Sequence, residues 1–524
     1  MSRWLNVGEI LTVMAAQYPD KEGAADLGRS LTFRQWNERS NRLANGLLGL
    51  GLAKGERVAC LAHNRVEWLE YYMAAAKAGL VCVPILFRLA PAECRHILED
   101  SGAAACLVDA GLVATTDALR GDLGQVRHWV HLGAAEAPEG YLAYEDLLAG
   151  ASPEEPRVDV HHRDLWTLTY TSGTTGHPKG AMRSHESYAA FFLTNIVAME
   201  FNRHDRGLLV MPFSHINSIF YSFSLTCCGA TAIVYDRPSF DPEHLLQVLE
   251  ERRITFTSLV PTHYVMILAL DEGVKGRHDV ACVRKLLCSS APARRETKRG
   301  ILEFFSNSDL YEAYGSTEAG KVTLLTPDKQ FEKLGSIGRE IPGTGLIRLL
   351  DEDRNEITAP GQVGELFSRT SACFDGYWKQ PETTAAAFEG QWFSAGDLAY
   401  RDAEGYFYLV DRKKNMIISG GENVYPSEVE EVVAEHPAVS TVAVIGLPDE
   451  KWGELVAAVV VLAEGCEPCD ALADEITAAT AGKIAGYKRP RRVIFVPADE
   501  LPRTATGKVL HRQLRDRFGH WSST

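Results

Sequence analysis

Two spacings of hydrophobic residues alternate along the first part of the chain. Asn6 and Glu9 have the spacing of a capping box, and the apolar residues behind them repeat at the helical period, so a helix is expected there. Short apolar runs at 58–62 and 80–86 have the length of buried strands. Because both signals keep alternating to about residue 350, the pattern predicts an α/β fold with a large multi-layered N-terminal domain and parallel-type sheets.

The pattern changes at about residue 340. Short alternating segments between glycines predict a β-rich subdomain, and a charged stretch at 411–415 follows it. We therefore predict two domains, 1–411 and 412–524, the second a small α+β domain. Its expected elements are helices at 426–435, 470–484 and 510–517 and strands at 439–445, 455–462 and 492–496.

Composition narrows the class of protein. The chain has 524 residues, of which 46% are hydrophobic and 23% charged, as in ordinary globular proteins. Its formal net charge of −15 argues against general binding to nucleic acids or anionic membranes. The most apolar run, 455–463, is too short to span a bilayer, and the first residues lack a secretory h-region. Since the 11 cysteines are also scattered, we expect a cytoplasmic protein with free thiols.

The clearest chemical signal is the segment Tyr170-Thr-Ser-Gly-Thr-Thr-Gly-His-Pro-Lys-Gly180. It follows an alternating strand pattern and precedes a helical pattern that starts at Ser187. Glycines let the backbone approach a phosphate chain closely, and hydroxyls, backbone N–H groups and a lysine can donate to it. The spacing differs from that of a Walker A loop. We interpret the segment as a phosphate-binding loop between a strand and a helix.

This loop resembles the phosphate-binding signature of the adenylate-forming superfamily, which includes acyl-CoA synthetases, adenylation domains and beetle luciferases. Segments similar to the family's other motifs follow in the family's order along nearly the whole chain. They are Met211-Pro-Phe-Ser-His215, Tyr314-Gly-Ser-Thr-Glu318, Trp392-Phe-Ser-Ala-Gly-Asp397, Asp411-Arg412, Gly420-Gly-Glu-Asn-Val-Tyr-Pro426 and Pro502-Arg-Thr-Ala-Thr-Gly-Lys508. Ser394 and Ala395 depart mildly from the family's Thr-Gly-Asp motif.

The resemblance implies that a carboxylate attacks the α-phosphorus of ATP, which builds charge that cations and oriented donors must meet. The β- and γ-phosphates would be held by Thr171, Ser172, Gly173, Thr174, Thr175, Gly176 and Lys179. Glu318, together with Thr174, would ligate Mg²⁺, which prefers carboxylate and phosphate oxygens. The remaining nucleotide contacts would come from Ser290, Ala291, Pro292, Tyr314, Gly315, Ser316, Thr317, Asp397 and Arg412. Asp397 would accept both ribose hydroxyls.

The family's C-terminal domain carries a lysine for the first half-reaction and rotates before the second. By resemblance, Lys508 would bridge the substrate carboxylate and the α-phosphate. The C-terminal domain is therefore expected to be mobile, with the active site at the junction of the two domains. The pivot would be Lys414, where the family often has Asp.

The second half-reaction implies coenzyme A, whose thiol would accept the acyl group. Gly420, Gly421 and Glu422 would face the thiol tunnel, where missing side chains let a pantetheine arm pass. The densest basic run of this acidic chain contains the candidates for the phosphates of coenzyme A, which are Tyr487, Arg489 and Arg491. The alternative is that this run is a solvated basic rim.

The acyl pocket is expected from the segments after His215 and around Glu318. The residues assigned to it are His215, Asn217, Phe220, Tyr221, Gly320 and Lys321. His215 would line this pocket or gate the thiol channel. No Asp or Glu stands at the position where amino-acid-activating relatives place an aspartate. The aromatic residues of this set indicate an acyl pocket of limited depth. We therefore predict a short- or medium-chain, alicyclic or aromatic monocarboxylate.

Lys321 has two interpretations. It either pairs with a second polar or anionic group of the acid, or it is a solvated lysine at the rim of the loop. Histidines outside the motifs, among them His185 and His263, are expected at surface or capping positions.

We therefore predict an AMP-forming carboxylic acid–CoA ligase that uses ATP, Mg²⁺ and coenzyme A on a small-molecule acid and could form a homodimer. One alternative is a stand-alone adenylation enzyme that loads a phosphopantetheinyl carrier protein. Another is a non-catalytic paralogue that binds ATP and an acyl group, and the motifs alone leave a luciferase-like oxidase open. The intact set Lys179, Glu318, Asp397, Arg412 and Lys508 argues against the non-catalytic paralogue.

Overall fold

The structure is a computed structural model that describes residues 5–133, 136–171, 178–289, 293–419, 422–449, 451–503 and 509–519. Its contacts divide the chain into two compact units. Unit 1 comprises Met1–Ile347 and Ser368–Phe393, and unit 2 comprises Arg348–Phe367 and Ser394–Thr524. The expected domain boundary at 411/412 stays a prediction, because a division by contacts does not show where the chain bends.

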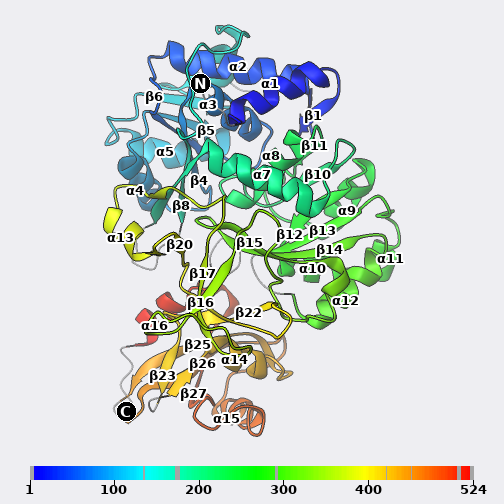
Figure 1. The fold of residues 1–524 in the computed structure, drawn as a ribbon, viewed down its shortest axis with the longest axis vertical. Coiled ribbons are helices and arrows are strands. Elements are labelled where there is room, and N and C mark those ends of the chain that lie inside the picture. Colours follow the sequence, from blue (N-terminus) through cyan, green and yellow to red (C-terminus); the bar gives the residue numbers. More distant parts are fainter. Residues whose placement is uncertain are drawn as a thin grey trace. The chain divides into compact units, whose positions relative to one another are not determined.

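Unit 1 is built on two large sheets whose inner strands are parallel (Figure 1). The first sheet has the strand order β15 (Gly320–Leu325), β14 (Asp309–Ser316), β13 (Lys285–Ser289), β12 (Phe256–Leu259), β10 (Arg206–Leu209), β11 (Thr231–Val234), β1 (Glu22–Ala25) and β2 (Ser30–Thr32). The second has the order β18 (Gly376–Tyr377), β9 (Lys179–Ser184), β8 (Leu165–Thr171), β4 (Val81–Ile85), β3 (Arg57–Leu61), β5 (Ala105–Asp109), β6 (His128–Leu132) and β7 (Leu142–Ala143). A hairpin of β19 (Phe388–Glu389) and β20 (Trp392–Phe393) also belongs to unit 1.

Helices cover both faces of each sheet. They are α1 (Val7–Gln17), α2 (Phe33–Gly49), α3 (Glu67–Ala78), α4 (Pro91–Ser101), α5 (Val113–Arg120), α6 (Tyr144–Ala149), α7 (His185–Met199), α8 (Ile216–Cys227), α9 (Pro242–Glu251), α10 (Pro261–Leu268), α11 (Glu272–Lys275), α12 (Arg295–Phe304) and α13 (Pro381–Ala386). The first helix begins behind Asn6 as expected, although its side chain accepts from the Gly8 N–H group and not from Glu9.

Alternate strand residues point into different hydrophobic clusters. Leu209 and Cys60, one from each sheet, belong to the largest cluster, which also contains residues of α1, α2, α3, α7 and α8. The neighbouring Leu208 packs with α9, α10 and α12, and Leu61 packs with α4 and α5. Unit 1 is therefore a five-layered α/β structure, as period-2 strands buried on both faces require.

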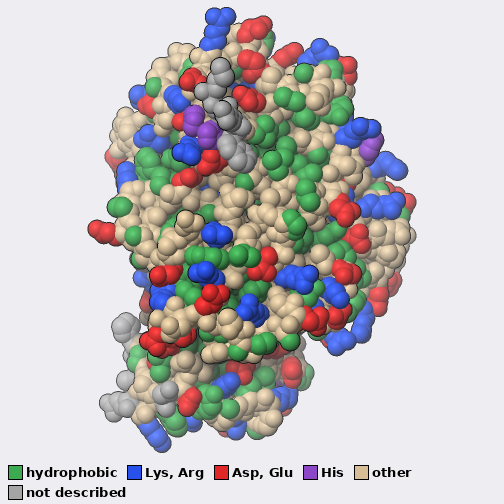
Figure 2. Space-filling view, in the orientation of Figure 1, with side chains coloured by type: hydrophobic (Ala, Val, Ile, Leu, Met, Phe, Trp, Pro, Cys, Tyr) green, Lys and Arg blue, Asp and Glu red, His purple; other side chains and the backbone are tan. Residues whose placement is uncertain are grey.

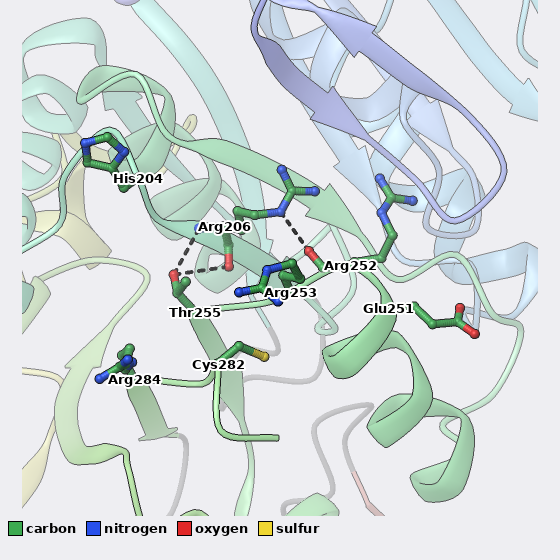
Figure 3. A pocket seen from close by; sticks show the side chains of 8 residues that line it. All are labelled: His204, Arg206, Glu251, Arg252, Arg253, Thr255, Cys282 and Arg284. Atoms are coloured by element: carbon green, nitrogen blue, oxygen red, sulfur yellow. Dashed lines mark hydrogen bonds between the residues drawn. The ribbon is translucent and has the colours of Figure 1, made fainter. Parts of the chain in front are cut away.

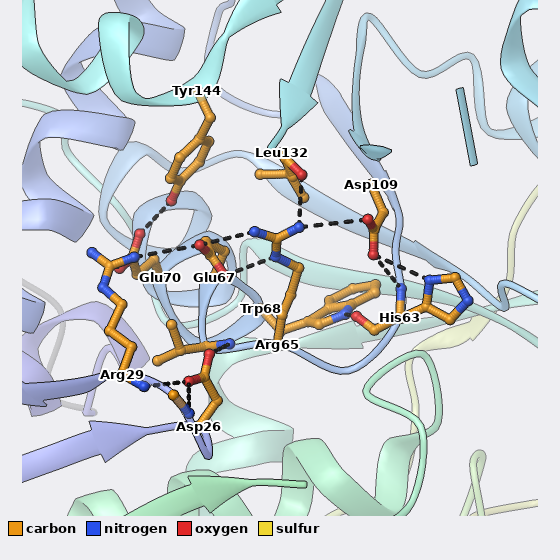
Figure 4. A network of polar contacts seen from close by, with 12 residues as sticks. Asp26, Arg29, His63, Arg65, Glu67, Trp68, Glu70, Asp109, Leu132 and Tyr144 are labelled. Atoms are coloured by element: carbon orange, nitrogen blue, oxygen red, sulfur yellow. Dashed lines mark hydrogen bonds and ion pairs between the residues drawn. The ribbon is translucent and has the colours of Figure 1, made fainter. Parts of the chain in front are cut away.

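A buried polar network joins the two sheets near the start of α3 (Figure 4). Asp26, which follows β1, accepts from the Val66 N–H group at 3.2 Å. Asp109, at the end of β5, accepts from the His63 N–H group at 3.2 Å and lies 3.6 Å from the Arg65 guanidinium. Since the first carboxylate comes from one sheet and the second from the other, the segment that leads into α3 is held by both.

Unit 2 contains an antiparallel β-rich part and a small α+β part. The first has β16 (Ile347–Leu350), β17 (Gly364–Ser368), β21 (Asp397–Arg401) and β22 (Phe407–Arg412). The second has β23 (Ile417–Ser419), β24 (Glu422–Val424), β25 (Val439–Asp449), β26 (Gly453–Leu462) and β27 (Arg492–Phe495), with α14 (Pro426–Val433), α15 (Asp470–Ala479) and α16 (His511–Phe518). Helices α14 and α15 pack on one face of this sheet and α16 on the other.

The predicted fold class is confirmed, with a large α/β region and a small C-terminal α+β part. Each helix and strand expected after residue 425 is present, but α15 ends at Ala479 and not near 484, where Gly482 takes a φ of +77°. Positive and negative side chains are interspersed over the face seen in Figure 2. Among the described residues, no helix is long and apolar enough to cross a membrane.

Candidate active site

The predicted phosphate loop joins two antiparallel strands, so its expected place between a strand and a helix is wrong. Strand β8 pairs with β9 in a register that sets Thr171 opposite Lys179, and α7 starts only after β9. The predicted loop includes Lys179 and Gly180, which are the first two residues of β9. Five residues assigned to the phosphates lie outside the described residues, and these are Ser172, Gly173, Thr174, Thr175 and Gly176.

Glu318 lies in the turn between β14 and β15, beside the end of β8. Its Oε1 accepts hydrogen bonds from the Thr171 hydroxyl at 3.4 Å and the Tyr377 hydroxyl at 3.0 Å. The Lys179 ammonium lies 5.3 Å from the centroid of the Tyr377 ring. The structure therefore brings three predicted residues together with Tyr377, which the sequence analysis did not single out.

The hairpin that carries Glu318 depends on glycine. Gly315 faces Lys321 across the β14–β15 pair, beside a bulge at Tyr314. A Cβ atom at position 315 would lie 2.0 Å from the Gly320 carbonyl oxygen, so no other residue fits without moving the backbone. Ser316 closes the turn by accepting from the Ala319 N–H group at 3.0 Å. These residues of the Tyr-Gly-Ser-Thr-Glu motif therefore shape the turn that presents the carboxylate.

Arg183 on β9 is a buried residue that contacts the same turn. It was not predicted from the sequence. Its side chain is fully buried, and its guanidinium donates to the carbonyl oxygens of Thr317, at 2.6 Å, and of Ala372. Burial lowers the pKa of Arg183. The available signal was a charged residue at an inward position of an alternating strand, where a buried cation needs acceptors.

His215 and Asn217 begin α8 at the carboxyl ends of the parallel strands. The Asn217 amide donates to the hydroxyls of Ser258, at 3.1 Å, and Ser289, at 3.3 Å, which lie on β12 and β13. The side chain of His215 is half-buried, and desolvation lowers its pKa to about 4, with a smaller contribution from Arg88. His215 is therefore a neutral imidazole at physiological pH. In open α/β sheets, ligands bind at this edge.

The rim interpretation of Lys321 is wrong. The residue is 6% exposed on β15, and its ammonium donates to Asn195 Oδ1 on α7. Desolvation lowers its pKa to about 7. Phe220 and Tyr221, predicted with it for the acyl pocket, are likewise buried, at 5% and 4% exposure. The surface position expected for His185 is also wrong, because it is fully buried and accepts from the Val7 N–H group.

Unit 2 holds the predicted ribose and phosphate contacts side by side. Asp397 and Arg412 are cross-strand partners on β21 and β22, and a 3.1 Å ion pair joins the Arg412 Nε to Asp397 Oδ1. Lys414 lies in the turn between β22 and β23, where its carbonyl accepts from Arg515 at 2.9 Å. The pivot role of Lys414 stays a prediction.

The candidate contacts for coenzyme A already have partners inside unit 2. Arg489 donates to the Thr480 hydroxyl at 3.2 Å and the Thr477 carbonyl at 3.1 Å, which holds the end of α15. The guanidinium of Arg491 lies 3.9 Å from the ring centroid of Trp452. Their role, like those of the half-buried Tyr487 and the exposed Glu422, stays a prediction. The other residues assigned outside the described parts are Gly420, Gly421, Ser290, Ala291, Pro292 and Lys508.

The residues around Glu318 fit Mg²⁺ better than a metal held by a full set of protein ligands. Among the described residues, no three His, Cys, Asp or Glu side chains gather as a metal site. One carboxylate beside hydroxyl groups and a phosphate loop is what Mg²⁺ requires, since this ion keeps several waters and binds substrate phosphates.

A surface pocket of about 460 Å³ lies elsewhere in unit 1 (Figure 3). It is lined by His204, Arg206, Glu251, Arg252, Arg253, Thr255, Cys282 and Arg284. Arg206, Thr255 and Arg284 lie at the amino ends of β10, β12 and β13. The pocket is therefore at the opposite ends of the strands from Asn217 and is separate from the candidate active site.

Comparison with known proteins identifies the family of the chain. The model of the AMP-binding enzyme family matches residues 11–378, and that of the AMP-binding enzyme C-terminal domain matches 428–508. The chain is 37% identical to a feruloyl-CoA synthase of an Amycolatopsis species over 504 residues, covering 94% of this chain and 95% of the relative. It is 34% identical to a long-chain-fatty-acid–CoA ligase of Mycobacterium tuberculosis over 521 residues, covering 98% of each.

A solved structure extends the likeness to three dimensions. The anthranilate CoA ligase AuaEII in complex with anthranoyl-AMP superposes with a TM-score of 0.88 at 28% identity, covering 99% of this chain and 98% of that one. The chain belongs to the AMP-binding enzyme family, within the adenylate-forming superfamily and its AMP-forming acyl-CoA synthetases. The predicted family and the predicted class of acid–thiol ligase are confirmed, and the carrier-loading and non-catalytic alternatives are not favoured.

Proposed function

We propose that this chain joins an aromatic or alicyclic carboxylic acid to coenzyme A, by way of an acyl-adenylate. The carboxylate oxygen attacks the α-phosphorus of ATP, the bond to pyrophosphate breaks, and the thiol of coenzyme A then attacks the acyl carbon and releases AMP. The observation that carries the proposal is Glu318 held between Thr171 and Tyr377 at the end of the phosphate loop.

Residues of unit 1 serve the first step. Lys179 meets the charge that develops on the phosphates, and Glu318 would hold Mg²⁺, which would supply further positive charge at the phosphates. Arg183 keeps the turn of Glu318 in place through the Thr317 carbonyl, so it is a positioning residue. His215 is neutral and hence serves as a polar wall of the acyl site and not as an acid or a fixed charge.

The substrate class follows from the buried side chains of α8 and from the relatives. Phe220 and Tyr221 offer flat apolar walls, and no Asp or Glu stands beside them on α8 to receive a substrate ammonium. The names of two relatives specify a feruloyl and an anthranilate substrate, both aromatic. In unit 2, Asp397 would accept the ribose hydroxyls beside the Arg412 guanidinium, which lies 3.1 Å from it. A cytoplasmic location and a homodimeric state stay predictions.

The proposal is tested by pyrophosphate release from ATP and Mg²⁺ across aromatic, alicyclic and straight-chain acids, with and without coenzyme A. Release that is coupled to thioester formation and strongest with ring-containing acids is expected. Release without thioester would point to a carrier protein as acceptor, and preference for long straight chains would overturn the substrate class. Glu318→Gln serves as the control for release by a contaminating enzyme.

A further inference from the structure

Lys321 is a buried cation whose charge no described acidic side chain balances. Among the described residues, its ammonium donates a hydrogen bond to Asn195 Oδ1 and forms no ion pair with any Asp or Glu. An ammonium has three donors, so two remain. Removing a charge from water without a counter-ion is costly, so such an arrangement calls for an explanation.

Two other buried lysines of unit 1 have a carboxylate partner. Lys77, which is 6% exposed, lies 2.6 Å from Glu155, and the fully buried Lys298 pairs with Glu312. Lys321 is buried to the same degree without such a partner. The fold therefore balances these two buried ammonium groups, whereas no carboxylate of the described residues pairs with Lys321.

The surroundings of Lys321 are aromatic, and they include Phe220 and Tyr221, which the resemblance assigns to the acyl pocket. Its ammonium lies 5.7 Å from the ring centroid of Phe191 and 5.9 Å from that of Tyr221. Phe191 in turn stacks on Phe220 with centroids 3.5 Å apart. The faces of these rings attract a cation but cannot neutralise it. Lys321 also stands three residues after Glu318, on the strand that leaves its turn.

Asn195 orients the ammonium. Its amide nitrogen donates to the Ser224 hydroxyl at 3.1 Å, and that hydroxyl donates to the Phe220 carbonyl at 2.7 Å. The Oδ1 atom is therefore turned toward Lys321, which fixes one donor and leaves the other two directed elsewhere.

We propose that Lys321 binds a second carboxylate of the substrate, so that the acid is a ring-containing dicarboxylate of which one carboxylate is adenylated. The other carboxylate stays ionised and supplies the counter-ion that no described side chain provides. This inference rests on the proposed function, and it replaces the monocarboxylate expected from the aromatic residues alone.

The test uses substrates matched in shape but not in charge. Terephthalate and cyclohexane-1,4-dicarboxylate are each compared with their monomethyl esters and with benzoate and cyclohexanecarboxylate, by the kcat/KM of pyrophosphate release. The free diacids should exceed their esters by about tenfold or more, the range that a desolvated charge pair provides. Lys321→Met should remove that preference. Lys321→Gln keeps a polar donor but no charge, so it should also remove the preference and serves as the test if the methionine variant does not fold.

Lys77→Met is the matched control, since it deletes another buried ammonium of unit 1 that already has its own carboxylate. It should leave the ratio of diacid to ester unchanged. Esters or monoacids used as well as diacids by the wild type would overturn the inference while leaving the ligase function intact. So would equal losses for diacid and ester in both Lys321 variants. No pyrophosphate release with any acid would overturn the proposed function and the inference together.

Discussion

Replacing Lys321 by methionine should stabilise the protein, and the gain should depend on pH. Burial lowers the pKa of Lys321 from 10.5 to about 7, so between these values the unfolded chain binds a proton that the folded chain does not. The free energy of unfolding therefore rises with pH across this window, and the destabilisation is fully present below pH 7. On this basis the buried lysine lowers the free energy of unfolding by roughly 4 kcal/mol at pH 7 and by about 2 kcal/mol at pH 9.

Methionine is similar in length to lysine but cannot donate a hydrogen bond to Asn195. Loss of this hydrogen bond offsets about 1 kcal/mol of the gain in the free energy of unfolding. The thermal midpoints of wild type and Lys321→Met are compared at pH 7 and pH 9, so that other titrating groups cancel within each comparison. The variant should melt a few degrees higher at pH 7 and gain less at pH 9. Lys77→Met should gain less than Lys321→Met at pH 7, because Glu155 offsets part of the burial that lowers the pKa of Lys77.

The reasoning would be refuted by a Lys321→Met midpoint at or below that of the wild type at pH 7. An advantage that does not shrink at pH 9 would contradict it equally, because the gain would then come from packing and not from the buried charge.

Three further predictions follow from the site. Glu318→Gln should lower kcat for pyrophosphate release by roughly 100-fold or more at saturating Mg²⁺, and an unchanged kcat would remove this carboxylate from the mechanism. Arg183→Met should lower the free energy of unfolding by about 2–4 kcal/mol, seen as a lower thermal midpoint, because buried carbonyl oxygens lose their donor; a wild-type midpoint would contradict this. Since the pKa of His215 is lowered to about 4, the kcat/KM profiles of wild type and His215→Asn should have the same shape from pH 6 to pH 8, and a limb near pH 6.5 present only in the wild type would count against a neutral imidazole.

Much of the fold could be predicted because its signals are local. Strand β26 is one apolar run, and each C-terminal helix has a clear amphipathic period. The place of β9 could not be predicted, since its six residues show no period-2 pattern that would separate them from the glycine-rich loop before it. The end of α15 was missed because the apolar period continues to Ile484, whereas the helix ends at Ala479 before Gly482, which takes a positive φ.

The candidate site could be predicted where a motif carries it and not where tertiary contacts do. The Glu318 turn and the Asp397–Arg412 pair come from motifs that lie on neighbouring strands. Arg183 and Tyr377 reach the same turn from β9 and β18, and no spacing in the sequence links them to it. The burial of Lys321 likewise depends on α7 and α8, which cover it from more than ninety positions earlier in the chain.

The most direct test of the central claim follows the oxygen atoms of the acid. The protein is incubated with ATP, Mg²⁺, coenzyme A and an acid labelled with ¹⁸O in its carboxylate, and the products are analysed by mass spectrometry. Adenylation predicts one labelled oxygen in the phosphate of AMP, none in pyrophosphate, and one in the thioester. Unlabelled AMP, or label in inorganic phosphate together with ADP, would contradict an acyl-adenylate intermediate.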